Sequence, residues 1–189
     1  MDTRRLLEIL SVAERLKDTT RHCCTSQGRR ESVAEHSWRA ALMAYFLRDE
    51  FPEADMDRVI RMCLLHDMGE AFTGDVPVFE KSAADEQREA RLLDQWVGSL
   101  PEEYAGELRE MYAEMAALTT PEARIYKAID SLEALIQHNE SPLESWLPLE
   151  YDLQMTYADA RMEFSPYMKA LRQTVREDSI QKIENGKAE

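Results

Sequence analysis

Apolar residues recur at helical spacing along most of this 189-residue chain. They lie three or four positions apart, as on one face of an α-helix, and few windows show the period-two alternation that is typical of a strand. Only six glycines interrupt the chain, and glycine is among the residues that most weaken a helix. The sequence therefore predicts an all-α fold, and its 44% of hydrophobic residues can supply the core of one compact domain.

Capping and helix-breaking residues divide the chain into expected helices. Ser32 and Glu35 have the spacing of a capping box, in which each side chain satisfies a backbone donor at the other position. Thr120 precedes a proline, which is common at the first helical position. We expect residues 18–31 and 71–81 to be connecting segments. The expected helices cover residues 4–17, 32–51, 55–69, 82–97, 101–118 and 120 onward, with one or two more after Pro142 and Pro148 and fraying at Asn185-Gly186.

The formal net charge of −14 limits the classes of partner. Such a surface repels a polyanion such as duplex DNA, whereas a small phosphate can still bind where a few cations or a metal dominate one pocket. No apolar run approaches the ~20 residues needed to cross a bilayer, and the charged N-terminus has no signal-peptide core. The three cysteines, Cys23, Cys24 and Cys63, do not suggest a disulfide framework. We therefore expect a cytoplasmic protein with a small-molecule substrate and no nucleic-acid polymer or membrane as a partner.

A histidine–aspartate pair follows an apolar run in the expected third helix. His66 and Asp67 come directly after residues 62–65, and a buried charged pair is costly unless a metal or hydrogen bonds compensate. Adjacent helical side chains point about 100° apart, so both can reach one ion only if it lies between helices. His36 and Asp130 are candidates to complete the site from other helices. Two imidazoles and two carboxylates suit a divalent Mn, Co, Fe, Ni or Zn ion.

Each of these residues also has a structural interpretation without a metal. A buried histidine such as His36 is more often hydrogen-bonded than metal-bound, and Asp130 can instead face a buried arginine. The candidate ligands lie far apart in sequence, so their spacing alone carries little specificity. The motifs around them must decide between the two interpretations.

Four short motifs supply that context. They are Glu35-His36-Ser37, Leu64-Leu65-His66-Asp67-Met68-Gly69-Glu70, Gly74-Asp75-Val76-Pro77 and Lys127-Ala128-Ile129-Asp130. In this order they resemble the HD-domain phosphohydrolases, most closely the branch that contains 5'-deoxynucleotidases. The resemblance covers roughly residues 17–149. It implies that residues 1–189 form a single HD-type helical bundle, with its core at about 17–149, C-terminal helices at 150–185 and a metal site among the core helices.

The resemblance also implies a role for each matching position. Glu70 corresponds to a residue that acts on the attacking water as base or acid, and Asp75 to a second carboxylate that positions this water. One divalent metal ion is implied, and its four ligands correspond to His36, His66, Asp67 and Asp130.

Three further residues are candidates to contact the substrate. Arg21 corresponds to a phosphate-contacting arginine of the family. Lys81 lies where the related enzymes often carry a lysine after Gly-Asp-x-Pro. At the position after Arg21, where a deoxynucleotidase of the family uses a tryptophan beside the sugar, this chain has His22, so sugar selection can differ here.

The predicted function is metal-dependent hydrolysis of nucleoside 5'-monophosphates, with deoxynucleotides as expected substrates. Water attacks phosphorus and the nucleoside leaves as an alcohol. Two alternatives stay open: an HD-type phosphodiesterase that acts on a small nucleotide, and a non-catalytic helical interaction module that holds a metal. Relatives also suggest a homodimer, for which the methionine- and tyrosine-rich residues 104–118 offer apolar surface.

Overall fold

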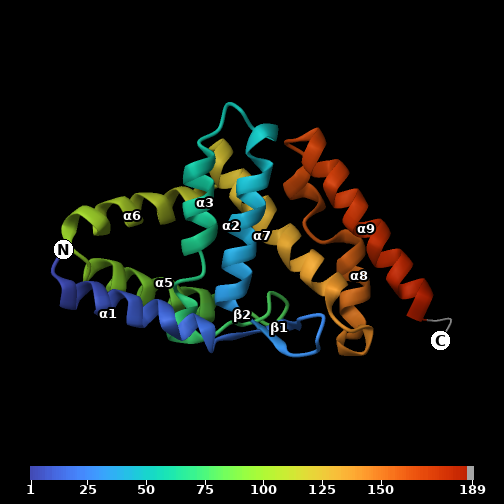
Figure 1. The fold of residues 1–189 in the computed structure, drawn as a ribbon, viewed down its shortest axis with the longest axis horizontal. Helices are drawn as coiled ribbons and strands as arrows, with labels where there is room; N and C mark the ends of the chain where they lie inside the picture. Colours follow the sequence, from blue (N-terminus) through green and yellow to red (C-terminus); the bar gives the residue numbers. More distant parts are fainter. Residues whose placement is uncertain (187–189) are drawn as a thin grey trace.

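The computed structural model describes residues 1–186, and it confirms the all-α prediction (Figure 1). The helices are α1 (Thr3–Glu14), α2 (Val33–Leu47), α3 (Met56–Leu65), α4 (Glu70–Thr73), α5 (Ala83–Gly98), α6 (Glu102–Ala117), α7 (Pro121–Glu140), α8 (Pro148–Thr156) and α9 (Pro166–Gly186). Short 3-10 turns are η1 (Arg15–Lys17), η2 (Arg48–Glu50), η3 (Leu143–Ser145) and η4 (Asp159–Met162), and one two-stranded sheet pairs β1 (Thr20–Cys24) with β2 (Arg30–Ser32).

Helix α7 lies at the centre of the fold. Helices α2, α3, α6 and α9 pack against it, and α1, α5 and α6 lie at the end of the molecule that carries the N-terminus (Figure 1). Burial extends along most of α7 and includes the polar side chains of Ser131, Glu133, Gln137 and His138. A helix that is buried on nearly all sides is in a position to supply both core and site residues.

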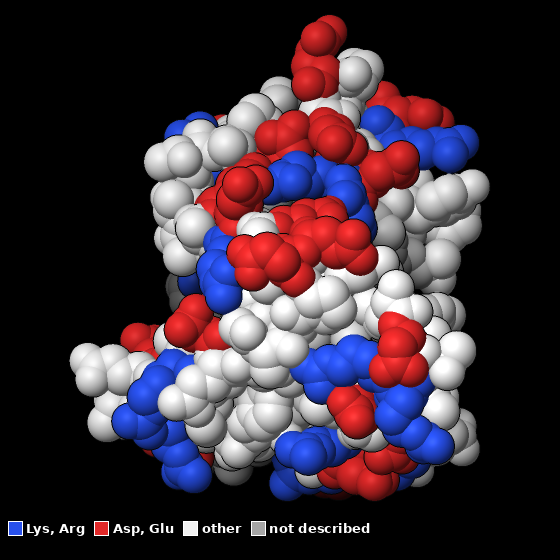
Figure 2. Space-filling model, turned by 90° about the vertical axis from the view of Figure 1, so that its left-hand side faces the viewer, with Lys and Arg blue, Asp and Glu red and all other residues white. Residues whose placement is uncertain are grey.

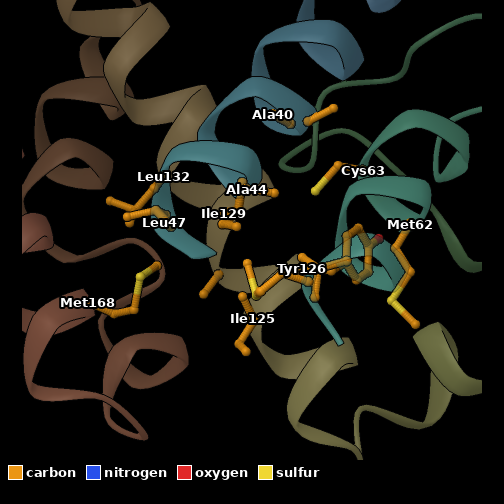
Figure 3. Close-up of a cluster of buried hydrophobic side chains, with 14 of the residues drawn as sticks. Ala40, Ala44, Leu47, Met62, Cys63, Ile125, Tyr126, Ile129, Leu132 and Met168 are labelled. Atoms are coloured by element: carbon orange, nitrogen blue, oxygen red, sulfur yellow. The ribbon is translucent and has the colours of Figure 1, made fainter. Parts of the chain in front are cut away.

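The main core lies where α2, α3, α7 and α9 meet (Figure 3). On α2, Ala40 and Ala44 are fully buried, and these small side chains allow neighbouring helices to approach closely. Cys63 of α3 is also fully buried and packs as a small hydrophobe, as expected. Ile129 and Leu132 complete the contact from α7. This packing fixes the relative positions of the three helices that carry the candidate metal ligands.

The segment 18–31 is not the simple connecting stretch that we expected. Strands β1 and β2 form an antiparallel ribbon with Thr20 opposite Ser32 and Cys24 opposite Arg30. The ribbon rests on the C-terminal part of α7, where Gln137 Nε2 donates a hydrogen bond to the Cys24 carbonyl. Most β1 side chains are therefore half-buried whichever way they point, so the sequence shows no alternation that would have revealed a strand.

The third helix ends earlier than predicted. It stops at Leu65, with His66 as its C-cap, whereas the sequence suggested Gly69. Turns follow, and the short helix α4 then occupies residues 70–73, part of the segment expected to be a loop. Gly74, with φ of +79°, ends α4 in a conformation that favours glycine. As a result, the histidine–aspartate pair lies at the end of a helix, where the chain turns around the site.

The ends of the chain also differ from the expected pattern. Of the apolar stripe in the first helix, only Leu16 is buried, while Leu6 and Leu10 stay exposed. Helix α9 continues through Gly186, where we expected fraying. Among the helices over residues 1–186, none combines the length and apolar character needed to span a bilayer.

The predicted capping box at the start of α2 is confirmed. Glu35 N donates to Ser32 Oγ over 3.3 Å, and Ser32 N donates to the Glu35 carboxylate over 2.9 Å. We expect Ser32→Ala to lower the free energy of unfolding by about 1 kcal/mol, because it leaves a helix donor without a partner. Urea denaturation would measure the change, with the exposed Ser26→Ala as control. Equal midpoints for the two variants would contradict this role of the cap.

Candidate metal centre and active site

The four side chains predicted as metal ligands converge on one point. His36 Nε2 lies 3.2 Å from His66 Nε2 and 3.1 Å from Asp130 Oδ1. Asp67 Oδ2 lies 3.0 Å from His66 Nε2 and 3.8 Å from His36 Nε2. The chain thus gathers two imidazole nitrogens and two carboxylate oxygens from α2, the C-terminal end of α3 and α7.

Hydrogen bonds on the far side of each imidazole fix its tautomer. His66 Nδ1 lies 2.9 Å from the Cys63 carbonyl oxygen, which can only accept, so Nδ1 carries the hydrogen. His36 Nδ1 contacts a carboxylate oxygen of Glu133. Burial alone would raise the pKa of Glu133, but His36 and Arg39 lower it, so this carboxylate is ionised and accepts. Both rings therefore direct Nε2 toward the cluster, the orientation that a metal ligand needs.

The carboxylates of the cluster favour positive charge between them, and a divalent cation would supply it. Burial alone would lower the pKa of His66, yet the carboxylates of Asp67 and Asp130 raise it to about 10. Without a metal, His66 therefore binds a second proton at Nε2, and a divalent cation at the cluster would take the place of this proton between the two carboxylates. Neighbouring ligands that each lie about 2.1 Å from one ion are about 3.0 to 3.4 Å apart, depending on the coordination geometry, close to the separations found here. The mixed nitrogen and oxygen set suits a borderline divalent metal.

Glu133 is a site residue that the sequence analysis missed. Its side chain is fully buried and joins His36 to Arg39, whose Nε donates to Glu133 Oε1 over 2.6 Å. Arg39 is held in turn by Glu140. The sequence did contain a signal for Glu133. It is an ionisable residue within an apolar helix, the same feature by which Asp130 was recognised.

We expect Glu133→Gln to weaken metal binding about 10- to 100-fold, as is typical when the hydrogen-bond partner of a ligating histidine is changed. Glutamine has no charge to offset Arg39 and stabilises the Nδ1–H tautomer of His36 less well. Competition with a chelator would measure the metal dissociation constant. Glu140→Gln is the matched control, since it also removes a carboxylate from Arg39 but leaves His36 untouched. Equal dissociation constants for the two variants would argue against a positioning role.

Arg21 reaches the edge of the cluster from strand β1. Its Nη1 lies 3.8 Å from Asp67 Oδ2, and its Nε lies 3.2 Å from Glu31 Oε2 on the paired strand. Burial would lower the pKa of Arg21, but Asp67, Glu133 and Glu31 raise it, so the guanidinium stays charged. The β-ribbon therefore places a cation beside the proposed ligands, where an anionic substrate would meet it.

A cavity of about 460 Å³ opens beside the cluster. Glu70 and Asp75 both line it, and Glu70 is buried. Burial, together with Asp67 and Asp75, raises the pKa of Glu70 to about 10. Burial likewise raises the pKa of Asp75, although Arg21 opposes this. Two carboxylates with raised pKa values thus border the cluster, in the kind of environment where enzymes hold proton-transferring groups.

The other two substrate-contacting candidates also line the cavity, but each is held by a carboxylate. Lys81 Nζ lies 2.7 Å from Glu89 Oε2. His22 Nε2 lies 3.0 Å from Glu150 Oε1, and the His22 ring meets Phe79 edge-on. The His22–Glu150 pair therefore forms part of the cavity wall.

Lys127 and Glu150 are among the cavity residues that were not identified from the sequence. Lys127 is part of a quoted motif, and its Nζ lies 2.8 Å from Asp130 Oδ2, so it holds the oxygen of Asp130 that does not face His36. Glu150 comes from α8. Nothing in the local sequence marks Glu150, because only the packing of α8 brings it to the cavity.

Comparisons with known proteins point in the same direction. A family model described as HD domain matches residues 13–172. Human 5'-deoxynucleotidase HDDC2 is 32% identical over 141 residues, which cover 72% of this chain and 68% of that protein. The 5'-deoxynucleotidase hdd1 of Schizosaccharomyces pombe is 27% identical and covers 70% of each chain. A solved structure described as a predicted metal-dependent phosphohydrolase from Magnetospirillum magnetotacticum matches with a TM-score of 0.76 and 28% identity, over 94% of this chain and 96% of that one.

Proposed function

The chain belongs to the HD-domain family, and on that basis we propose that it is a metal-dependent phosphomonoesterase of nucleoside 5'-monophosphates. It is a hydrolase, similar over most of its length to proteins named 5'-deoxynucleotidase. Deoxynucleoside 5'-monophosphates are the substrates that we expect it to favour. One divalent ion is the expected cofactor, and Mn, Co, Fe, Ni and Zn all suit the donor set.

The observation that carries this proposal is the convergence of two imidazole nitrogens and two carboxylate oxygens beside a cavity. His36, His66, Asp67 and Asp130 would hold the ion. When bound, a divalent ion polarises a phosphoryl oxygen and makes hydroxide available near neutral pH. Arg21, at the edge of the cluster, would neutralise charge that gathers on the phosphoryl oxygens as the phosphorus–oxygen bond breaks.

The two carboxylates of the cavity wall would handle the attacking water. Glu70 would take a proton from water as the new phosphorus–oxygen bond forms and return a proton to the leaving alcohol. Asp75 would accept a hydrogen bond from the same water and orient it. The geometry supports these roles, since both side chains line the cavity that the cluster borders.

Surface charge favours a small substrate over a polymer. On the face shown in Figure 2, acidic and basic side chains are interspersed, and no continuous basic tract crosses it. The net charge is −14, opposite to the basic groove expected for a nucleic-acid polymer. A cavity of about 460 Å³ is within the range typical of small-molecule sites.

A metal analysis followed by a substrate panel tests the proposal. The purified protein would first be analysed for bound elements and then loaded separately with Mn, Co, Fe, Ni or Zn. Release of phosphate from deoxy- and ribonucleoside 5'-monophosphates would be compared with cleavage of cyclic and linear diesters. We expect turnover of monophosphates with at least one metal. Turnover of diesters alone would favour the phosphodiesterase, and a metal-loaded protein that hydrolyses neither would favour the interaction module.

We also propose that the protein forms a homodimer, but through a surface other than that of residues 104–118. The apolar face of that segment packs inward, with Met111 and Met115 buried. Helix α2 instead exposes Trp38 and Phe46, at 60% and 73% exposure, eight residues apart on one side. Contiguous exposed apolar surface is typical of an interface. Sedimentation of Phe46→Glu beside the unaltered chain would test it, and a monomeric unaltered chain would refute it.

A further inference from the structure

The cavity extends beyond the four-residue cluster to a segment that the proposed chemistry does not use. Its wall continues along α7 with Ser131 and Ala134, passes Leu153 of α8 and reaches Arg161 of η4. If the phosphate of a nucleoside 5'-monophosphate lies at the cluster, its sugar and base must occupy this extension. The following inference therefore rests on the proposed function.

Arg161 is held in place by one nitrogen only. Its Nη1 donates to Ser131 Oγ over 2.6 Å and to Tyr157 Oη over 3.0 Å, and its guanidinium lies 5.2 Å from the centre of the Tyr157 ring. Nε and Nη2 make no hydrogen bond with any of residues 1–186, and neither is sealed from solvent. The side chain is thus held in place through Nη1, and the edge formed by Nε and Nη2 presents two parallel hydrogen-bond donors.

The charge of Arg161 is also unmatched, in contrast to its neighbours. Asp159, in the same turn, pairs with Arg172 Nε at 3.0 Å and with Arg176 Nη2 at 2.6 Å. Within residues 1–186, no carboxylate lies within ion-pair distance of Arg161. A guanidinium that is ordered by hydroxyl groups but not neutralised is suited to bind two acceptors side by side.

We propose that Arg161 reads the nucleobase and gives the enzyme a preference for guanine nucleotides. Guanine presents O6 and N7 as adjacent acceptors, which match the two-donor edge of an arginine, whereas adenine presents a donor beside N7. Ala134 and Leu153 provide apolar walls for the flat faces of the ring. Arg161 donates to Ser131 and Tyr157 and to none of the four cluster residues, which is consistent with a place toward the base rather than the phosphate.

The test is the ratio of kcat/KM for dGMP to that for dAMP, which differ only in the base. We expect the unaltered enzyme to favour dGMP about tenfold, the effect of one good bidentate contact. Arg161→Gln should bring the ratio close to one, mainly through the KM for dGMP. Arg161→Lys should do nearly the same, because it keeps the charge but loses the planar edge. Tyr157→Phe, which removes one anchor, should lower the ratio in part.

A binding measurement keeps this test separate from that of the proposed function. Calorimetry on the metal-loaded protein would compare deoxyguanosine with deoxyadenosine, which carry no phosphate and do not turn over. Arg161-dependent preference for deoxyguanosine in a protein that hydrolyses no nucleotide would support the base contact while refuting the phosphatase. Arg124→Gln, an exposed change on α7, is the control and should alter nothing. An unchanged ratio in both Arg161 variants, or equal loss of affinity for every nucleotide and for inorganic phosphate, would overturn the proposal.

Discussion

Asp67→Ala should lose both the bound metal and hydrolysis of nucleoside monophosphates. Its Oδ2 lies 3.0 Å from His66 Nε2 and 3.8 Å from both His36 Nε2 and Arg21 Nη1, so it joins both imidazoles to the guanidinium of Arg21. A catalytic metal supplies several kcal/mol of transition-state stabilisation. We therefore expect kcat/KM to fall about a thousandfold or more. His66→Ala should give the same result.

Elemental analysis and the nucleotide assay would be run on the same preparations. Asp57→Ala is the matched control, since Asp57 is an exposed carboxylate on α3 and has no contact with the cluster. Circular dichroism would show whether the variant keeps its helices. A folded Asp67→Ala protein that retains one metal per chain and a normal rate would exclude Asp67 as a ligand.

Helices such as α3 could be predicted from sequence because apolar residues recur on the one face that is buried, here Met56, Val59, Met62 and Cys63. The start of α2 was also marked by Ser32 and Glu35, which form the expected capping box. The β-ribbon could not be predicted, because β1 lies half-buried against α7 and has no polar face to alternate with an apolar one. Hydrophobic periodicity in a sequence reveals an element when one of its sides is buried and the other exposed. It gives no signal for an element such as β1, in which neither side is fully exposed.

The candidate site was predictable where an ionisable residue interrupted an apolar helix. This signal marked His66, Asp67 and Asp130, and the motifs then linked them to His36. The same signal was present at Glu133, which was missed because its role becomes clear only when α2 brings His36 within hydrogen-bond reach. Residues such as Glu150 lie in ordinary polar surroundings in sequence. Only the packing of α8 and η4 beside α7 turns such residues toward the cavity.

Glu70→Gln should keep the metal and lose most turnover. Burial and the anions Asp67 and Asp75 raise the pKa of Glu70 to about 10, so Glu70 holds its proton in the isolated chain. A cation bound at the cluster opposes these anions and favours the ionised form, which brings the proton of Glu70 within reach of exchange near neutral pH. Glutamine keeps the shape but cannot exchange this proton. We expect kcat to fall about 10²- to 10⁴-fold with little change in KM.

The pH profile adds a second readout for the same residue. If Glu70 acts as a base, only its ionised form is active, so kcat of the unaltered enzyme falls as the pH drops below the pKa of Glu70 in the holoenzyme. That acid limb should be absent from the residual activity of Glu70→Gln. Glu80→Gln, an exposed change in the following loop, should retain both the normal kcat and its fall at low pH. A normal rate in Glu70→Gln would remove Glu70 from the mechanism, and loss of the metal would make it a ligand instead of a proton carrier.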